Sequence, residues 1–95
     1  MPSMINIAEI RAQDGKSVEL GEALTALVPP TRAEPGCLGY DLAFGSNGEW
    51  VMIEEWRDGQ ALAEHYEQPY VVEFLGRIGD LVAGEPNVRS YTRKI

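Results

Sequence analysis

Hydrophobic and polar residues alternate along four short stretches of the chain, and this alternation predicts four β-strands. The predicted strands cover residues 4–12, 37–45, 50–57 and 87–95. In the first of them Ile5 and Ile7 share one face, while Ala8 and Ile10 lie on the other. The segment 46–49 contains an Asn-Gly pair, which predicts a hairpin turn between the second and third strands.

A long helix is predicted between the first two strands. Apolar residues from Val18 to Val28 recur there at helical spacing. Pro29 and Pro30 should stop or kink this helix, because proline lacks the backbone N–H group that a helix interior needs.

A pair of helices is predicted between the third and fourth strands. Asp58 is a natural N-cap for a short helix over 59–68, and Pro69 is well placed to begin the second helix, which should end at Gly84. The order of elements is then strand, helix, strand, strand, helix pair, strand. This is the split βαβ order of an α+β, ferredoxin-like fold, in which helices cover one face of a four-stranded antiparallel sheet. The length suits one domain over residues 1–95.

Both faces of the predicted sheet carry apolar residues at their centre. The third strand places Trp50, Met52 and Trp56 on one face, and Val51 and Ile53 on the other. Helices can cover only one face, and the other would be a hydrophobic patch that is unusually large for a soluble monomer. A second copy of the same sheet is the simplest cover. We therefore expect a homodimer whose sheets pack face to face.

The charge balance narrows the list of partners. Fifteen acidic residues outnumber eight basic ones, for a formal net charge of −7. Nucleic acids and anionic membranes both attract basic surfaces, so neither is expected as a partner. No apolar run approaches the ~20 residues of a membrane span, and the first residues lack the pattern of a signal peptide. The single cysteine, Cys37, permits no internal disulfide, so a reduced, cytoplasmic setting is expected.

Three segments carry a resemblance to a known family. They are INIAEIRAQDG near the start, EPGCLGYDL at 34–42 and VMIEEWRDGQALAEHYEQPY at 51–70. In these segments the chain resembles the antibiotic biosynthesis monooxygenase family, and within it the bacterial quinol monooxygenases. The resemblance implies a dimeric α/β-barrel. The family also includes haem-degrading enzymes, isomerases of small phosphorylated sugars and members without known activity, so the fold alone does not fix the reaction.

The family pattern of Glu-x-Trp, then Asp, then His is matched by Glu54, Trp56, Asp58 and His65. Quinol-monooxygenase-like members often carry a second histidine further on, and here Tyr70 stands in its place. Members that oxidise aromatic substrates use neither metal nor flavin. The resemblance therefore implies a monooxygenase without cofactor that acts on a quinol, a polyphenol or a similar aromatic small molecule. Such an enzyme needs an apolar pocket, one base and donors that fix the substrate anion.

His65 and Glu54 are the candidate catalytic residues. Histidine exchanges protons readily near neutral pH, and His65 follows Leu62 on a helix face that should point to the sheet. Glu54 shares a strand face with Met52 and Trp56. If that face lies toward the helices, Glu54 enters the pocket, where it could orient His65 or take a proton itself. The alternatives are one structural hydrogen bond for the histidine, and a salt bridge or a place in the dimer interface for the glutamate.

An aromatic pocket of a few hundred Å³ is expected beside these two residues. The residues expected to line it and bind the substrate are Trp56, Tyr40, Tyr66, Tyr70, Phe74, Met52 and Asn6. Tyr66, Tyr70 and Phe74 follow one another at intervals of four, which is the spacing of one helix face and is also typical of core packing. One histidine and one cysteine far apart in sequence give no metal-ligand spacing, so no metal site is expected.

Other functions stay open. An isomerase or tautomerase would use His65 and Glu54 to move a proton, and its site should be more polar, with basic residues for a phosphorylated substrate. A small-ligand-binding dimer without catalysis would be favoured by a histidine bonded to backbone with no cavity beside it. Haem degradation is disfavoured, because haem-degrading relatives carry an iron-binding histidine in the last long helix and residues 69–84 contain none.

Overall fold

The computed structural model describes residues 2–95 as a four-stranded sheet covered by three helices. The strands are β1 (Met4–Arg11), β2 (Cys37–Phe44), β3 (Glu49–Trp56) and β4 (Asn87–Thr92), and their order in the sheet is β2-β3-β1-β4 with every pair antiparallel. The helices are α1 (Ser17–Arg32), α2 (Gly59–Tyr66) and α3 (Pro69–Leu81). This is the predicted α+β, ferredoxin-like fold. None of the described helices is both long enough and apolar enough to cross a membrane.

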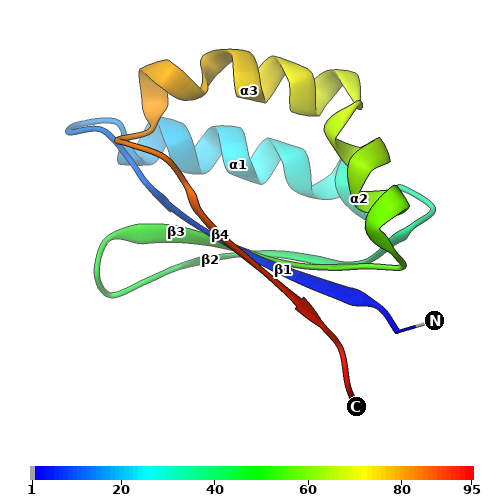
Figure 1. Cartoon of the computed structure of the whole chain (residues 1–95). Helices are drawn as coiled ribbons and strands as arrows, with labels where there is room; N and C mark the ends of the chain where they lie inside the picture. Colours follow the sequence, from blue (N-terminus) through cyan, green and yellow to red (C-terminus); the bar gives the residue numbers. More distant parts are fainter. Residues whose placement is uncertain (1) are drawn as a thin grey trace.

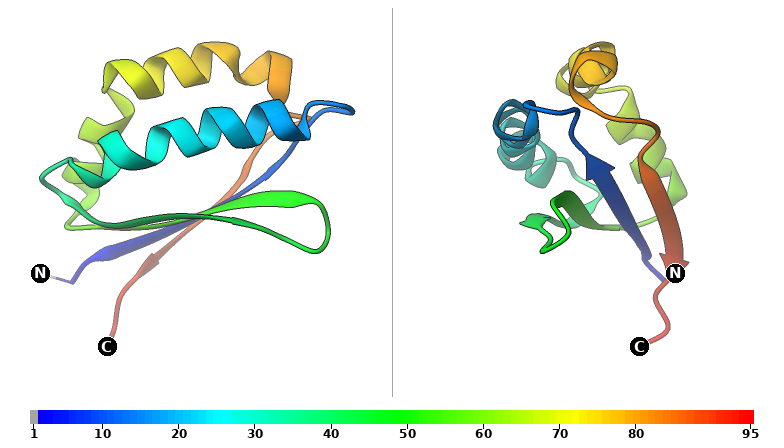
Figure 2. Two further views of the ribbon diagram at one scale, coloured as in Figure 1. Left: turned by 180° about the vertical axis from the view of Figure 1, so that it is seen from behind. Right: turned by 90° about the vertical axis from the view of Figure 1, so that its left-hand side faces the viewer.

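All three helices cover the same face of the sheet (Figure 1). Helices α1 and α3 lie side by side across it, and α2 packs at one end. No helix or strand of residues 2–95 covers the opposite face in either view of Figure 2. The core fills the space between helices and sheet. Its most buried members include Leu20 and Leu24 of α1 and Tyr40 and Trp56 of the sheet, each at most 1% exposed.

The register of the strands decides which residues face the helices. Asn6 of β1 lies opposite Glu54 of β3, which in turn lies opposite Tyr40 of β2. All three side chains are buried in the core. Further along the same face, Ala8 lies opposite Met52 and both are also buried. Glu54 therefore lies on the helix-covered face, together with the residues expected to form the pocket.

The bare face of the sheet has the apolar centre that the sequence pattern predicts. Ile5 and Ile7 of β1 lie there beside Ile53 of β3, which remains 42% exposed. Tyr91 of β4 lies opposite Ile5 and is 48% exposed. These residues form a hydrophobic surface that the described part of the chain leaves uncovered.

The first helix does not stop at the proline pair. Helix α1 continues through Pro29 and Pro30 to Arg32. The missing N–H groups would have donated to the carbonyls of Thr25 and Ala26, four residues earlier. Both of these residues are exposed, so water can replace the lost donors.

The last helix and the last strand end earlier than predicted. Helix α3 ends at Leu81, because Val82 has an extended backbone and pairs with Ala12 in an isolated β-bridge. Gly84 follows with φ +72°, a left-handed conformation that favours glycine, and so forms part of the turn after the helix. Strand β4 ends at Thr92, three residues before the predicted end.

Candidate functional site

His65 is buried where α2 packs over the end of β3. Its helix begins as predicted, since the Ala61 N–H donates to the Asp58 carboxylate at 2.9 Å. Ala61 and His65 form the buried face of α2. A Cβ on Gly36 would lie only 2.3 Å from the Cβ of Ala61, so glycine permits the segment before β2 to approach this helix closely. That approach brings Glu34 to the imidazole.

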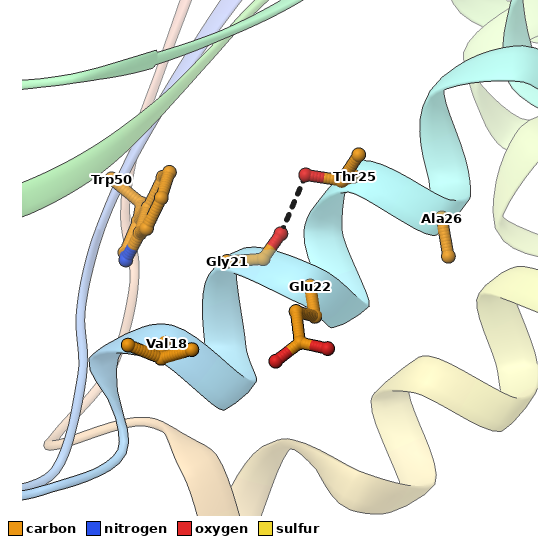
Figure 3. Close-up of a pocket in the computed structure, with 6 residues that line it drawn as sticks. All are labelled: Val18, Gly21, Glu22, Thr25, Ala26 and Trp50. Carbon is orange, nitrogen blue, oxygen red and sulfur yellow. Dashed lines mark hydrogen bonds between the residues drawn. The ribbon is translucent and has the colours of Figure 1, made fainter.

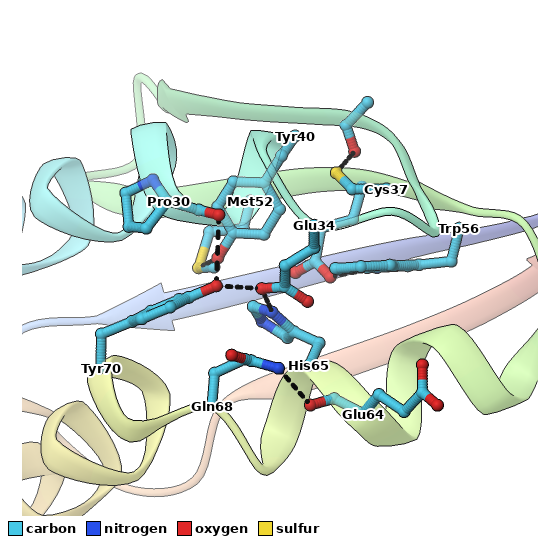
Figure 4. A network of polar contacts seen from close by, with 12 residues as sticks. Pro30, Glu34, Cys37, Tyr40, Met52, Trp56, Glu64, His65, Gln68 and Tyr70 are labelled. Atoms are coloured by element: carbon cyan, nitrogen blue, oxygen red, sulfur yellow. Dashed lines mark hydrogen bonds and ion pairs between the residues drawn. The ribbon is translucent and has the colours of Figure 1, made fainter.

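Glu34, in the connection between α1 and β2, is the hydrogen-bond partner of His65. Its Oε2 lies 2.8 Å from Nδ1 of His65, and the two side chains are 9% and 4% exposed. The Tyr70 hydroxyl donates to the same carboxylate oxygen and lies 3.2 Å from the Pro30 carbonyl (Figure 4). Glu54, which the sequence offered as the residue that orients the imidazole, makes no hydrogen bond to it among the described residues.

Aromatic rings surround the imidazole on its other sides. The Trp56 ring centroid lies 4.7 Å from that of His65, with the planes tilted by 42°. The rings of Tyr66 and Tyr40 follow at 5.5 and 5.7 Å. Because Trp56 is fully buried, it forms a fixed wall that limits how far the imidazole can rotate.

Glu54 is a second buried carboxyl group, only 5% exposed. It accepts a hydrogen bond from Nε1 of Trp56 at 2.9 Å and forms no ion pair with any described residue, so the alternative of a salt bridge is wrong. Burial raises the pKa of Glu54 from its ordinary value of 4.5 to about 7. The hydrogen bonds from Trp56 and Asn6 lower this pKa, and the nearby charge of Glu34 raises it. Near neutral pH its neutral and ionised forms are comparably populated.

A cavity of about 160 Å³ lies beside His65 and Glu54, between the sheet and α3. Tyr40 and Tyr66 also line it, and the other lining side chains are all apolar. No arginine or lysine is among the described residues of its wall. The cavity is smaller than the few hundred Å³ expected, and an apolar protein cavity of ~150 Å³ is known to hold benzene. It therefore suits one aromatic ring.

Most of the predicted site residues share this cavity. Those that line it are Tyr40, Met52, Glu54, His65, Tyr66 and Phe74. Trp56 and Asn6 do not line it, and instead lie behind it, in contact with Glu54.

Tyr70 is also absent from the cavity wall. It was expected there because it continues a spacing of four residues from Tyr66. The two residues belong to different helices, since α2 ends at Tyr66 and α3 begins at Pro69. The change of helix turns the Tyr70 side chain to Glu34. The pKa of Tyr70 is raised to about 12. Burial is the largest cause, and the hydrogen bond to Glu34 is the second.

A larger open groove of about 590 Å³ lies between the first turns of α1 and Trp50 (Figure 3). Among the described residues of its wall, Glu22 is the one titratable side chain, and no imidazole is present. The Thr25 hydroxyl is already bonded to the Gly21 carbonyl within the helix at 2.7 Å. The groove offers no acid–base pair, so the smaller cavity is the candidate site. Within residues 2–95 no three side chains of the types His, Cys, Asp or Glu are arranged to hold a metal ion.

Comparison with known proteins identifies the class to which this fold and site belong. The family described as Antibiotic biosynthesis monooxygenase matches residues 3–77, which is most of the chain. The chain belongs to this family, as its sequence motifs indicated.

Similar proteins come from several bacteria. The chain is 30% identical over 83 residues to "Putative monooxygenase YcnE" of Bacillus subtilis, covering 85% of this chain and 87% of that protein. It is 40% identical over 60 residues to "Putative monooxygenase Rv0793" of Mycobacterium tuberculosis, covering 62% of this chain. The matched regions span only 59% of Rv0793 and 57% of sll1783 from Synechocystis, less than two thirds of either relative.

Solved structures match along nearly the whole chain. The crystal structure of PA3566 from Pseudomonas aeruginosa superposes with a TM-score of 0.94 at 33% identity, covering 100% of this chain and 97% of that one. The structure of Rv0793 superposes with a TM-score of 0.93 at 30% identity, covering 98% and 96%.

Proposed function

We propose that the protein is a cofactor-independent monooxygenase that acts on a small, uncharged aromatic substrate such as a quinol. One observation carries the proposal. A cavity sized for a single ring brings together a buried imidazole and a buried carboxyl group whose pKa is about 7, in a wall that is otherwise apolar or phenolic. Membership of the Antibiotic biosynthesis monooxygenase family supports the class of reaction.

The reaction needs no reductant beyond the substrate. A quinol that loses a hydroxyl proton is electron-rich enough to pass an electron to O₂, and recombination at a ring carbon forms a peroxide. Loss of water then leaves a hydroxyquinone, so that quinol and O₂ give hydroxyquinone and H₂O. The ring supplies all four electrons, one oxygen atom enters the ring, and the other leaves in water.

The residues of the cavity fit the proton transfers of this reaction. In the proposal His65 takes the hydroxyl proton of the substrate, and Glu54 in its neutral form donates a hydrogen bond to the second oxygen. Burial raises the pKa of both Tyr40 and Tyr66, so these phenols stay protonated and serve as further donors. The apolar remainder excludes water, which strengthens each of these interactions.

The lining disfavours an isomerase of phosphorylated sugars. A phosphate group needs cationic or backbone donors. The described wall of this cavity contains the carboxyl group of Glu54 and no arginine or lysine, and a second carboxyl group, Glu34, lies behind His65. The bond from His65 to a carboxylate, with a cavity beside it, also differs from the backbone-bonded histidine expected of a protein that only binds a ligand.

Oxygen uptake with a panel of quinols tests the function. We expect the natural protein to consume O₂ faster than the no-protein background with one-ring neutral quinols, and more slowly with carboxylated analogues. Ala8 lines the cavity, so Ala8→Leu should fill much of it and lower the rate at least ~10-fold. Ala63→Leu, on the exposed side of α2, is the matched control and should keep the rate. Uptake equal to background across the panel, with tight quinol binding, would instead support a ligand-binding protein.

The proposal includes a homodimer formed by the bare faces of two sheets. Introducing a charge at its apolar centre, as in Ile53→Glu, should separate the subunits, because a buried unpaired carboxylate is costly. Sedimentation should then give the mass of one chain, 10.5 kDa, in place of twice that value. Val72→Glu on α3, where the side chain is 55% exposed, is the control and should stay dimeric. A natural protein that sediments as a single chain would contradict the dimer.

A further inference from the structure

Glu34 does not line the cavity, yet it is bonded to the imidazole that does. We infer that Glu34 is a positioning residue whose carboxylate holds the Nδ1–H tautomer of His65 and leaves Nε2 unprotonated toward the substrate. The inference rests on the proposed role of His65 as base. It concerns the state of the ring itself, however, and that state can be measured without any substrate.

The hydrogen bonds at Glu34 determine where the proton lies. Its Oε2 receives the Tyr70 hydroxyl and also faces Nδ1 of His65 at 2.8 Å. In the inferred arrangement Glu34 is a carboxylate, whose oxygens can only accept hydrogen bonds, so Nδ1 is the donor and carries the proton. A neutral imidazole has one N–H donor and one acceptor nitrogen. Nε2 is then the acceptor, which is the form that a general base requires.

Three separate parts of the chain hold this arrangement in place. The hydroxyl of Tyr70, in the first turn of α3, donates to Glu34 and lies 3.2 Å from the Pro30 carbonyl in the last turn of α1. Glu34 follows α1 directly, and Trp56 of β3 packs against the imidazole. Because the carboxylate and imidazole are both almost fully buried, water does not compete for their bond. The other buried acid, Glu54, is bonded to the indole and leaves Nδ1 to Glu34.

The chain has a single histidine, so nitrogen NMR reads this tautomer without ambiguity. Tag-free protein labelled with ¹⁵N-histidine would be titrated to alkaline pH, where the ring is neutral. We expect the protonated-nitrogen shift on Nδ1 and the unprotonated shift on Nε2. In Glu34→Leu, which removes the acceptor, the Nε2–H form should become the major one. Glu34→Gln, whose carbonyl can still accept, should retain Nδ1–H in part, and Glu54→Gln should leave the tautomer unchanged.

Steady-state kinetics give a second test, because a residue with a purely structural role would not change kcat while leaving KM unchanged. Glu34→Gln should lower kcat by about 10- to 100-fold with little change in KM, because the base is misplaced while the cavity is intact. A natural protein with Nε2–H as its major form, or a Glu34→Leu variant that folds and keeps Nδ1–H, would overturn the inference. If the natural protein shows no oxygen uptake, the proposed function fails, and the tautomer measurement still decides the role of Glu34.

Discussion

At pH 8 the Glu54→Gln variant is expected to be more stable than the natural protein by about 2 to 3 kcal/mol. At pH 5 the same difference in the free energy of unfolding should be smaller than about 1 kcal/mol. Burial raises the pKa of Glu54 from 4.5 to about 7, so the folded state binds the proton more tightly than the unfolded state does. The free energy of unfolding of the natural protein should therefore fall as pH rises from 4.5 to 7 and level off above that. Glutamine has nearly the same shape as glutamate and does not ionise, so the part of the fall in unfolding free energy that Glu54 causes should be absent from the variant.

Urea unfolding of both proteins at pH 5 and pH 8 measures the effect, at one protein concentration because subunit association also contributes to stability. Glu55→Gln is the matched control. Glu55 is the next residue in the strand but lies on the opposite face, where its carboxylate accepts from Arg93 at 2.7 Å and its pKa is lowered. It should show no gain at pH 8. Equal stability of Glu54→Gln and the natural protein at both pH values would show that the Glu54 carboxylate is not buried as described.

The elements of this fold could be predicted because each has a local signal. The alternation of hydrophobic and polar residues predicted the four strands and their two faces. The N-cap Asp58 and Pro69 at the first helical position predicted where α2 and α3 begin. The ends of helices were harder to predict, since they depend on surroundings. Pro29 and Pro30 are tolerated because the carbonyls they leave unpaired face water, and the end of α3 is set by a bridge to Ala12 far away in sequence.

The site was predictable only in part, for a related reason. His65 and Glu54 stand out as titratable residues within apolar patterns, and the structure brings both to one cavity. Glu34 lies in a connection with no periodicity, 31 residues before His65, and its Glu-Pro-Gly context reads as an ordinary loop. Gly36, two residues after Glu34, is the signal that could have pointed to it. Glycine at this position and the small Ala61 let the loop that carries Glu34 approach α2 closely. Sequence spacing cannot show that contact, because it forms only when α2 folds back onto the loop.

Loss of the imidazole should have the largest effect on activity. If His65 is the general base, His65→Ala should lower kcat/KM for a neutral quinol by about 10²- to 10⁴-fold, the usual contribution of a positioned base. Glu64→Ala removes the exposed neighbour on the same helix and should keep the natural rate. The measurement is the initial rate of O₂ consumption over a range of quinol concentrations, with the background rate subtracted.

The same variant separates a chemical role from a packing role. His65→Ala leaves a space lined by Trp56 and Tyr66, where added imidazole can bind. If the ring acts as a base, imidazole should restore part of the rate in proportion to its unprotonated fraction, so the restored rate rises with pH. Imidazole that restores thermal stability without restoring O₂ uptake would mean that His65 only fills the core. Full activity in the untreated variant would contradict a base role for His65 and would leave Glu54, ionised above pH 7, as the carboxylate base among the described residues of the cavity wall.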